Sequence, residues 1–140
     1  MGTVISASKF LIENHASLSK PFIYCCPYED LECEAFSIGR ALAKELIAIQ
    51  PNRRTMKLEK CLKNVISDLP EGVVIKDIDV IFNPSYKVDI LNLLIVVYKK
   101  KPFSVIWPGI YIDGKLVYAE EGYPDYKAYS ISDYDVTCII

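Results

Sequence analysis

The stretch that decides the fold is Val73-Val74-Ile75-Lys76-Asp77-Ile78-Asp79-Val80-Ile81-Phe82, a nearly unbroken run of branched and aromatic apolar residues. Turn-forming residues bound it, with Pro70-Glu71-Gly72 before it and Asn83-Pro84 after it. A short apolar run with such boundaries predicts a strand buried on both faces, at the centre of a sheet covered by helices. Alternation along the strand would place Asp77 and Asp79 on one face, near the sheet edge where α/β proteins bind ligands.

Patterns on either side of this run predict alternating strands and helices. Short apolar runs at 21–26, 103–107 and 135–140 predict further strands, and residues 1–20 suggest a short helix and a loop. Helical periodicity covers 31–49 and 58–69, and Asn83-Pro84 predicts the start of a third helix that ends near Lys100. Asp113-Gly114 is a strong hairpin signal between arms at 110–112 and 115–119. We therefore expect one domain, residues 1–140, with a three-layer α/β fold, a mostly parallel central sheet and a C-terminal β-hairpin.

Composition excludes several classes of protein. The 140 residues are 51% hydrophobic and 24% charged, which fits an ordinary single domain with a core, and the net charge of −2 disfavours direct binding of nucleic acid. The longest apolar stretch, 90–98, is far shorter than the ~20 residues of a membrane helix. The N-terminus has no secretory pattern, so we expect a cytoplasmic protein with five reduced cysteines.

Catalytic and metal-binding motifs are weak. His15 is the single histidine, which excludes a credible Ser/His/Asp or Cys/His arrangement. A zinc site built from His15, Cys25, Cys26 and Cys33 would match no common ligand spacing. Metal binding by Glu29, Asp30, Glu32 and Asp79 is an alternative, but helix capping and a solvated face explain those acids more simply.

The predicted order of a strand, a loop, a long helix and a later acidic strand is the layout of a P-loop nucleotide-binding domain. The phosphate loop would fall between residues 25 and 36 and would need glycines and a lysine to hold phosphates. That segment contains neither, and four carboxylates stand within six of its residues: Glu29, Asp30, Glu32 and Glu34. They would repel a triphosphate, so the sequence favours the fold and disfavours the site.

The second half of the chain resembles a known family. The segments that carry the resemblance are residues 75–84, Asp89-Ile90-Leu91, Val105-Ile106-Trp107-Pro108-Gly109, Gly114-Lys115-Leu116-Val117-Tyr118-Ala119-Glu120 and Tyr123-Pro124-Asp125-Tyr126. Together they resemble the BrxF family, small P-loop proteins of the BREX phage-exclusion systems of bacteria and archaea. The resemblance covers residues 73–130, and its most specific parts are the Trp-Pro-Gly turn and the two Tyr-containing segments. Members of that family carry a Gly-rich Walker A loop, which this chain lacks, and an acidic Walker B strand, where Lys76 stands in place of the leading Asp.

The resemblance implies a degenerate P-loop-like accessory subunit of a BREX-type antiphage defence system, without catalytic activity or a bound cofactor. Its partners would be other BREX defence proteins, and self-association stays open. A tail rich in tyrosine and acidic residues suggests a partner surface, for which the candidates are Trp107, Tyr118, Tyr123, Tyr126 and Tyr129. The simpler interpretation is that these rings cover the edge of the sheet.

The alternative function is a divergent NTP-binding or NTP-hydrolysing subunit of the same system. It would use ATP and Mg²⁺, with Asp79 and Asp77 as acids on the metal side. Arg40, Arg53 or Arg54 would then contact the phosphates.

Overall fold

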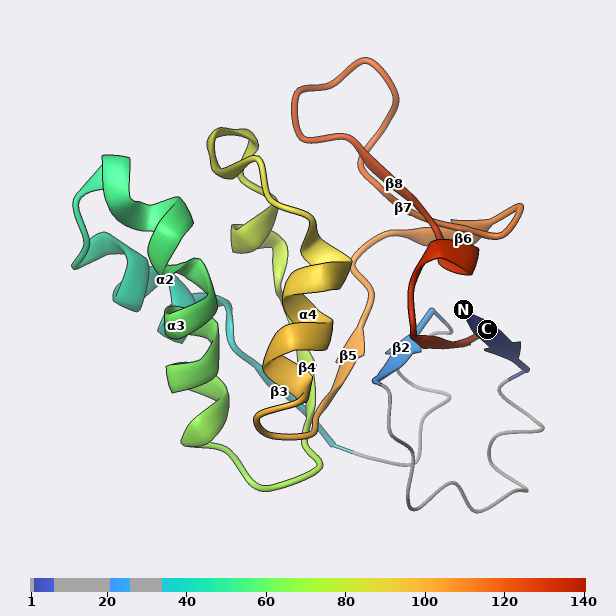
Figure 1. Ribbon diagram of the computed structural model, residues 1–140, viewed down its shortest axis with the longest axis horizontal. Coiled ribbons are helices and arrows are strands. Elements are labelled where there is room, and N and C mark those ends of the chain that lie inside the picture. The colour runs from blue at the N-terminus through green and yellow to red at the C-terminus, as the bar shows by residue number, and fades with distance from the viewer. Residues whose placement is uncertain (1, 7–20, 26–33) are drawn as a thin grey trace.

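The computed structural model describes residues 2–6, 21–25 and 34–140. Its main sheet has six strands, all parallel, in the order β1-β9-β2-β5-β4-β3 (Figure 1). The strands are β1 (Thr3–Ile5), β2 (Phe22–Tyr24), β3 (Ala35–Ser37), β4 (Val74–Lys76), β5 (Ser104–Ile106) and β9 (Thr137–Ile139). The last strand of the chain therefore lies inside the sheet, between β1 and β2. The prediction of a mostly parallel sheet in an α/β fold is confirmed.

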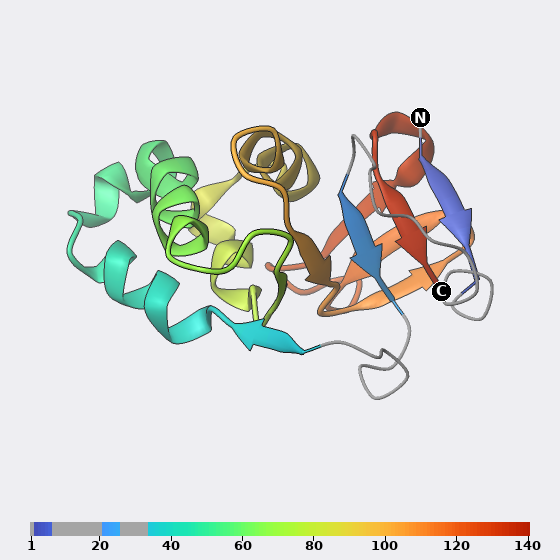
Figure 2. The same ribbon diagram turned by 90° about the horizontal axis from the view of Figure 1, so that it is seen from below.

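The helices gather around the β3-β4-β5 half of this sheet (Figures 1 and 2). They are α2 (Gly39–Ile47), the 3₁₀ turn η2 (Pro51–Arg53), α3 (Arg54–Ser67) and α4 (Ile90–Tyr98), with further 3₁₀ turns η3 (Asp79–Phe82) and η4 (Pro84–Tyr86). Each helix buries one apolar stripe, as Leu42 and Leu46 of α2 and Leu58 and Leu62 of α3 illustrate. These side chains belong to one core that also contains the inner residues of the sheet, such as Ile23 and Val105.

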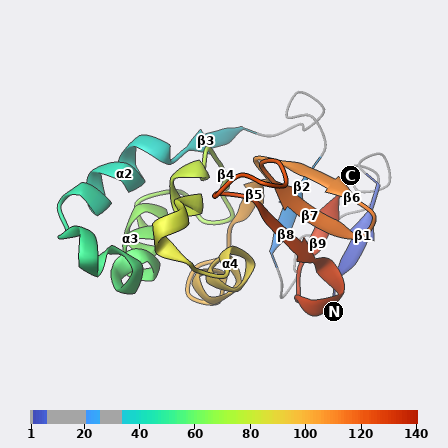
Figure 3. The ribbon, with the colours of Figure 1, turned by 90° about the horizontal axis from the view of Figure 1, so that it is seen from above.

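A second, antiparallel sheet lies over the β2-β9-β1 half (Figure 3). Its strands stand in the order β6-β7-β8 and are β6 (Ile110–Ile112), β7 (Lys115–Tyr118) and β8 (Lys127–Ser130). Asp113 and Gly114 both have positive φ angles, 50° and 74°, as the predicted two-residue hairpin turn requires. The hairpin is confirmed, and β8 and the 3₁₀ turn η5 (Ile131–Asp133) are elements that the sequence did not predict.

The central apolar run is a strand for only three residues. After β4 ends at Lys76, Asp77 adopts φ 60° and the chain leaves the sheet, so that Asp79 begins η3. The prediction of one long strand was wrong because an apolar run indicates burial and not conformation. Ile81 and Phe82 of η3, and Ile78 just before it, are as fully buried as they would be in a strand.

Two predicted helices begin later than expected. The helix predicted over 31–49 is strand β3 at Ala35–Ser37 followed by α2, while residues 26–33 lie outside the described part. Asn83 accepts a hydrogen bond from the backbone N–H of Ser85, but it caps the short turn η4, and α4 begins only after Asp89. The helix predicted over 58–69 is confirmed as α3. The first twenty residues contain strand β1 among those described, a strand that the sequence did not predict.

Candidate functional site

The carboxyl end of β4 is where the sequence placed a ligand site. There the backbone N–H of Ile38 donates to the carbonyl oxygen of Lys76 over 3.1 Å. A Cβ atom on Gly39 would lie 3.0 Å from the carbonyl oxygen of Asp77, so the start of α2 packs closely on this turn. Asp77 and Asp79 are both exposed. The expectation that they share one face of a strand was wrong, because β4 ends at Lys76.

The carboxylate of Asp79 has a protein partner. The Tyr118 hydroxyl donates a hydrogen bond to Oδ2 of Asp79 over 3.1 Å. The ring of Tyr118 stacks on Phe82, which belongs to η3 as Asp79 does, with 3.8 Å between ring centroids and 17° between planes. Burial, and then the charge of Asp79 and its hydrogen bond, raise the pKa of Tyr118 to about 12. Asp79 therefore helps to fasten β7 of the second sheet onto η3.

A chain of aromatic rings continues from this pair into the core. Phe82 makes an edge-to-face contact with Trp107 at 5.5 Å, and Trp107 makes one with Tyr129 at 6.4 Å. Tyr129 in turn contacts Tyr134 edge-on at 5.7 Å. Such pairs each contribute roughly 0.5–1.5 kcal/mol beyond the area they bury. The aromatic chain, defined as these four rings and Tyr118, joins the second sheet to η3 and to the end of β5.

Polar contacts accompany the aromatic chain at the start of α4. Asp89 caps this helix, because its Oδ1 accepts from the backbone N–H of Asn92 over 3.0 Å. Its Oδ2 accepts from the Tyr134 hydroxyl over 2.7 Å. The hydroxyl oxygen of Tyr129 accepts from the backbone N–H of Ile90 over 3.0 Å. At the start of α4, the N–H of Ile90 is thus satisfied by Tyr129 of β8 and the N–H of Asn92 by Asp89.

The candidate partner residues therefore separate into two groups. Trp107 is 4% exposed and donates from Nε1 to the carbonyl oxygen of Val117 over 2.9 Å, while Tyr129 is 8% exposed. These two rings are packed in the core. They are therefore not part of an exposed surface, although the sequence suggested them as partner-binding candidates. Tyr118 and Tyr126 are partly buried, and Tyr123 is 62% exposed. The hypothesis of a tyrosine-containing partner surface now depends on the loop that carries Tyr123 and Tyr126.

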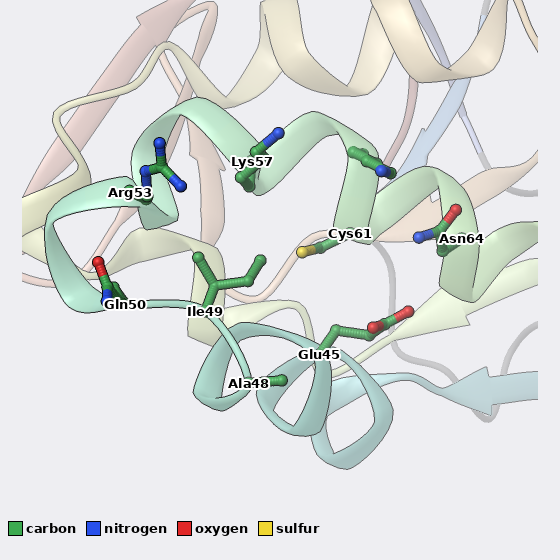
Figure 4. Close-up of a pocket in the computed structure, with 9 residues that line it drawn as sticks. Glu45, Ala48, Ile49, Gln50, Arg53, Lys57, Cys61 and Asn64 are labelled. Atoms are coloured by element: carbon green, nitrogen blue, oxygen red, sulfur yellow. The ribbon is translucent and has the colours of Figure 1, made fainter.

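A groove between α2 and α3 was not anticipated from the sequence. It encloses about 400 Å³, and Figure 4 shows Ile49 and Cys61 pointing toward the space between the helices. Its lining residues are Glu45, Ala48, Ile49, Gln50, Arg53, Lys57, Lys60, Cys61 and Asn64. A second hollow of about 460 Å³ shares Glu45 and Ala48 with it and extends along α2 toward Ser37. Burial raises the pKa of Cys61, which keeps this free thiol in its protonated form at neutral pH.

The groove is basic on its α3 side. Arg53, Lys57 and Lys60 are all exposed and follow one another at helical spacing, against the single acid Glu45. The signal was available in the sequence as basic residues at 53, 57 and 60, but the overall charge of −2 concealed it. This groove can attract an anionic group, and its apolar floor can accept a side chain.

Of the three arginines proposed for phosphate contact, Arg54 has a structural role. Nε of Arg54 donates to the carbonyl oxygens of Leu46 and Ile49, over 2.8 and 3.0 Å, and so closes the end of α2. Arg53 lines the groove, and Arg40 is exposed on the first turn of α2. In residues 2–6, 21–25 and 34–140, no group of three or more His, Cys, Asp or Glu side chains is placed to hold a metal ion. His15, Cys26, Glu29, Asp30, Glu32 and Cys33 lie outside that part.

No family model matches this chain, and neither a search of curated proteins nor a search of solved structures found a match. The described residues also contain no helix with the length and apolar character needed to cross a bilayer.

Proposed function

We propose that this protein is a non-catalytic accessory subunit of a BREX-type antiphage defence system, with a P-loop-like fold that has lost its nucleotide site. It would act in the cytoplasm by binding other proteins of that system. The resemblance of residues 73–130 to the BrxF family supplies the defence role, and the geometry of the site supports the lack of catalysis.

The strand order supports the fold component of this proposal. Numbered along the chain, the strands β2, β3, β4, β5 and β9 stand in the order 5-1-4-3-2. One strand, β5, therefore separates β2, which precedes the loop predicted for phosphates, from β4, which precedes Asp77 and Asp79. A parallel sheet in this order is compatible with the P-loop-like fold that we propose.

One observation supports the proposed lack of catalytic activity. In a working P-loop enzyme the acid at the end of the central strand would help to hold Mg²⁺. Here Asp79 instead accepts a hydrogen bond from Tyr118 at the contact between η3 and the second sheet. The segment 29–34 adds four carboxylates where a phosphate would bind.

Affinity purification of the tagged protein from its native host tests the proposal. We expect BREX proteins, such as the methyltransferase or the large ATPase of the system, to co-purify with the wild-type chain. Phage resistance should be lost when the gene is deleted and restored by Asp79→Asn, because the carboxylate has no catalytic role. Recovery of the protein alone, or loss of resistance in a stably folded Asp79→Asn variant, would contradict the proposal, and the second result would favour a divergent NTPase.

A further inference from the structure

Charge is distributed very unevenly over this chain. The basic hairpin, defined as α2, η2 and α3 (residues 39–67), contains seven basic and two acidic residues. The rest of the chain contains nine basic and sixteen acidic residues. Six of the seven basic side chains of the hairpin are exposed, and Arg54 is the partly buried one. The net charge of −2 is thus the sum of a positive hairpin and a negative remainder of the chain. The hairpin is a positive surface on an acidic protein.

The basic hairpin also exposes apolar side chains. Ile47 at the end of α2 is 74% exposed, and Met56 on the first turn of α3 is 75% exposed. In the sequence, Ile47 directly precedes Ala48 and Met56 directly precedes Lys57, and both Ala48 and Lys57 line the groove. Exposed aliphatic groups next to cations gain little from a phosphate backbone but gain from a partner that is both acidic and apolar. The hairpin therefore fits a protein surface better than a nucleic acid.

The chain itself carries a segment with that chemistry. The acidic loop, defined as residues 119–126 between β7 and β8, contains Glu120, Glu121 and Asp125 and no basic residue. Tyr123 stands in its middle with 62% of its surface exposed. Two backbone hydrogen bonds within the loop hold its conformation. The N–H of Tyr123 donates to the carbonyl oxygen of Glu120, and the N–H of Tyr126 donates to the carbonyl oxygen of Tyr123. It thus presents an aromatic ring and three carboxylates in an ordered form, which lowers the entropic cost of binding.

These two surfaces do not meet within one molecule. In Figure 1 the basic hairpin lies at one end of the molecule, and the acidic loop projects from the second sheet on the other side of η3 and η4. We propose that the groove of the basic hairpin of one molecule receives the acidic loop of a second copy of this chain. Tyr123 would enter the groove beside Ile49, and Glu120, Glu121 and Asp125 would lie against Arg53, Lys57 and Lys60. The groove volume of about 400 Å³ is within the range that seats a small ligand or a partner side chain.

The proposed contact joins two different surfaces, so it is heterologous. It closes into a dimer when both molecules exchange loops, and it continues into a longer assembly when they do not. Its charge complementarity makes it sensitive to salt, since the screening length falls from about 8 Å at physiological ionic strength to about 3 Å at 1 M. This inference is independent of the proposed role in defence.

Sedimentation velocity of the full-length protein, over a range of concentrations and at low salt, is the experiment. The wild type should form a larger species that dissociates at about 1 M salt. The hairpin variant Arg53→Glu/Lys57→Glu/Lys60→Glu and the loop variant Glu120→Lys/Glu121→Lys/Asp125→Lys should each be monomeric. An equimolar mixture of the two should associate again, because both contacts then join opposite charges. Tyr123→Ala should weaken association of the wild type at least tenfold.

The matched control is Lys87→Glu/Lys99→Glu/Lys115→Glu, which changes the net charge by the same amount at exposed positions outside the groove. It should associate as the wild type does, and circular dichroism should show all variants folded. A monomeric wild type at every concentration overturns the proposal, as does a mixture that fails to associate. Loss of association in the hairpin variant but not in the loop variant would exclude the loop as occupant. Salt-dependent binding of duplex DNA by a monomeric wild type would assign the hairpin to nucleic acid instead.

Discussion

Among single residues, the contact between Tyr118 and Asp79 should make the stability of the fold depend on pH in the alkaline range. Burial and the neighbouring carboxylate raise the pKa of Tyr118 from 10.0 to about 12. Because the folded-state pKa exceeds the unfolded one, this group stabilises the fold fully below pH 10 and loses that contribution as the pH rises toward 12. Asp79→Asn should lower the pKa of Tyr118 while leaving it above 10.0, since burial remains.

The measurement is the phenolate absorbance of wild type and Asp79→Asn across this pH range, with Tyr118→Phe subtracted from each to isolate one residue. At neutral pH the free energy of unfolding should change by less than about 1 kcal/mol, because an Asn side chain can still accept the hydrogen bond at this exposed site. An unchanged pKa of Tyr118 in Asp79→Asn would show that the two groups do not interact in solution.

Asp89 is the second residue whose role follows from its contacts. It caps α4 through Oδ1 and accepts from Tyr134 through Oδ2. Asp89→Ala should cost about 1–2 kcal/mol in urea unfolding because both contacts are lost, while Asp89→Asn should cost less because Asn is also a good N-cap. Equal losses in the two variants would mean that capping is not the reason for the effect.

At the scale of elements, the Trp-Pro-Gly turn after β5 has no room for a side chain at Gly109. A Cβ atom there would lie 1.9 Å from the carbonyl oxygen of Val117, the acceptor of the Trp107 hydrogen bond. Gly109→Ala should therefore destabilise by roughly 2–4 kcal/mol and separate Trp107 from β7. Unfolding followed by fluorescence of Trp107, the single tryptophan, measures this directly.

Gly114→Ala is the matched control for that turn. Gly114 has φ 74° but nothing within 4 Å of an added Cβ, so the cost there is backbone strain alone, about 1 kcal/mol. If both variants lose the same stability, the close approach at Gly109 is not what constrains the turn.

Truncation of Tyr129, which lies within β8, should cost far more stability than truncation of Tyr123, which lies in the acidic loop. Tyr129→Ala removes a buried ring and the acceptor for the N–H of Ile90, so a loss of about 3–5 kcal/mol is expected. Tyr123→Ala should stay within about 0.5 kcal/mol of the wild type because its ring is exposed. Thermal unfolding of both variants gives the comparison, and a large loss in Tyr123→Ala would show that the acidic loop packs against the core.

The elements that the sequence predicted well are those with local signals. Asp113-Gly114 defines its hairpin through two positive φ angles, and α3 has an unbroken apolar stripe. Elements without such a signal were missed or misplaced. The run from Val74 to Phe82 is buried in two different conformations that hydrophobicity does not distinguish, and β3 has a pattern that also fits the start of a helix.

The candidate site was less predictable than the fold. Tyr118 meets Asp79 across 39 residues of sequence, and the sequence cannot show that pairing. Likewise, the α2–α3 groove depends on how two helices pack, although its basic residues could have been noticed from their spacing. The type of a side chain indicates which interactions it can make. Only the tertiary structure determines which residues are its partners.

In the molecule as a whole, a six-stranded parallel sheet is joined to a small antiparallel sheet, and two carboxylates have structural roles. The carboxylate of Asp79 contacts the second sheet, that of Asp89 caps α4, and the basic hairpin has an excess of basic over acidic residues. The proposal that this chain binds other proteins and does not bind a nucleotide rests on these contacts and on the four carboxylates within residues 29–34.

Titration calorimetry with Mg-ATP tests the proposal that this chain does not bind a nucleotide. We expect no heat of binding when the full-length protein is titrated with millimolar nucleotide at low salt, where electrostatic attraction is strongest. A saturable isotherm with a micromolar dissociation constant would contradict it, most decisively if Asp79→Asn abolished the binding.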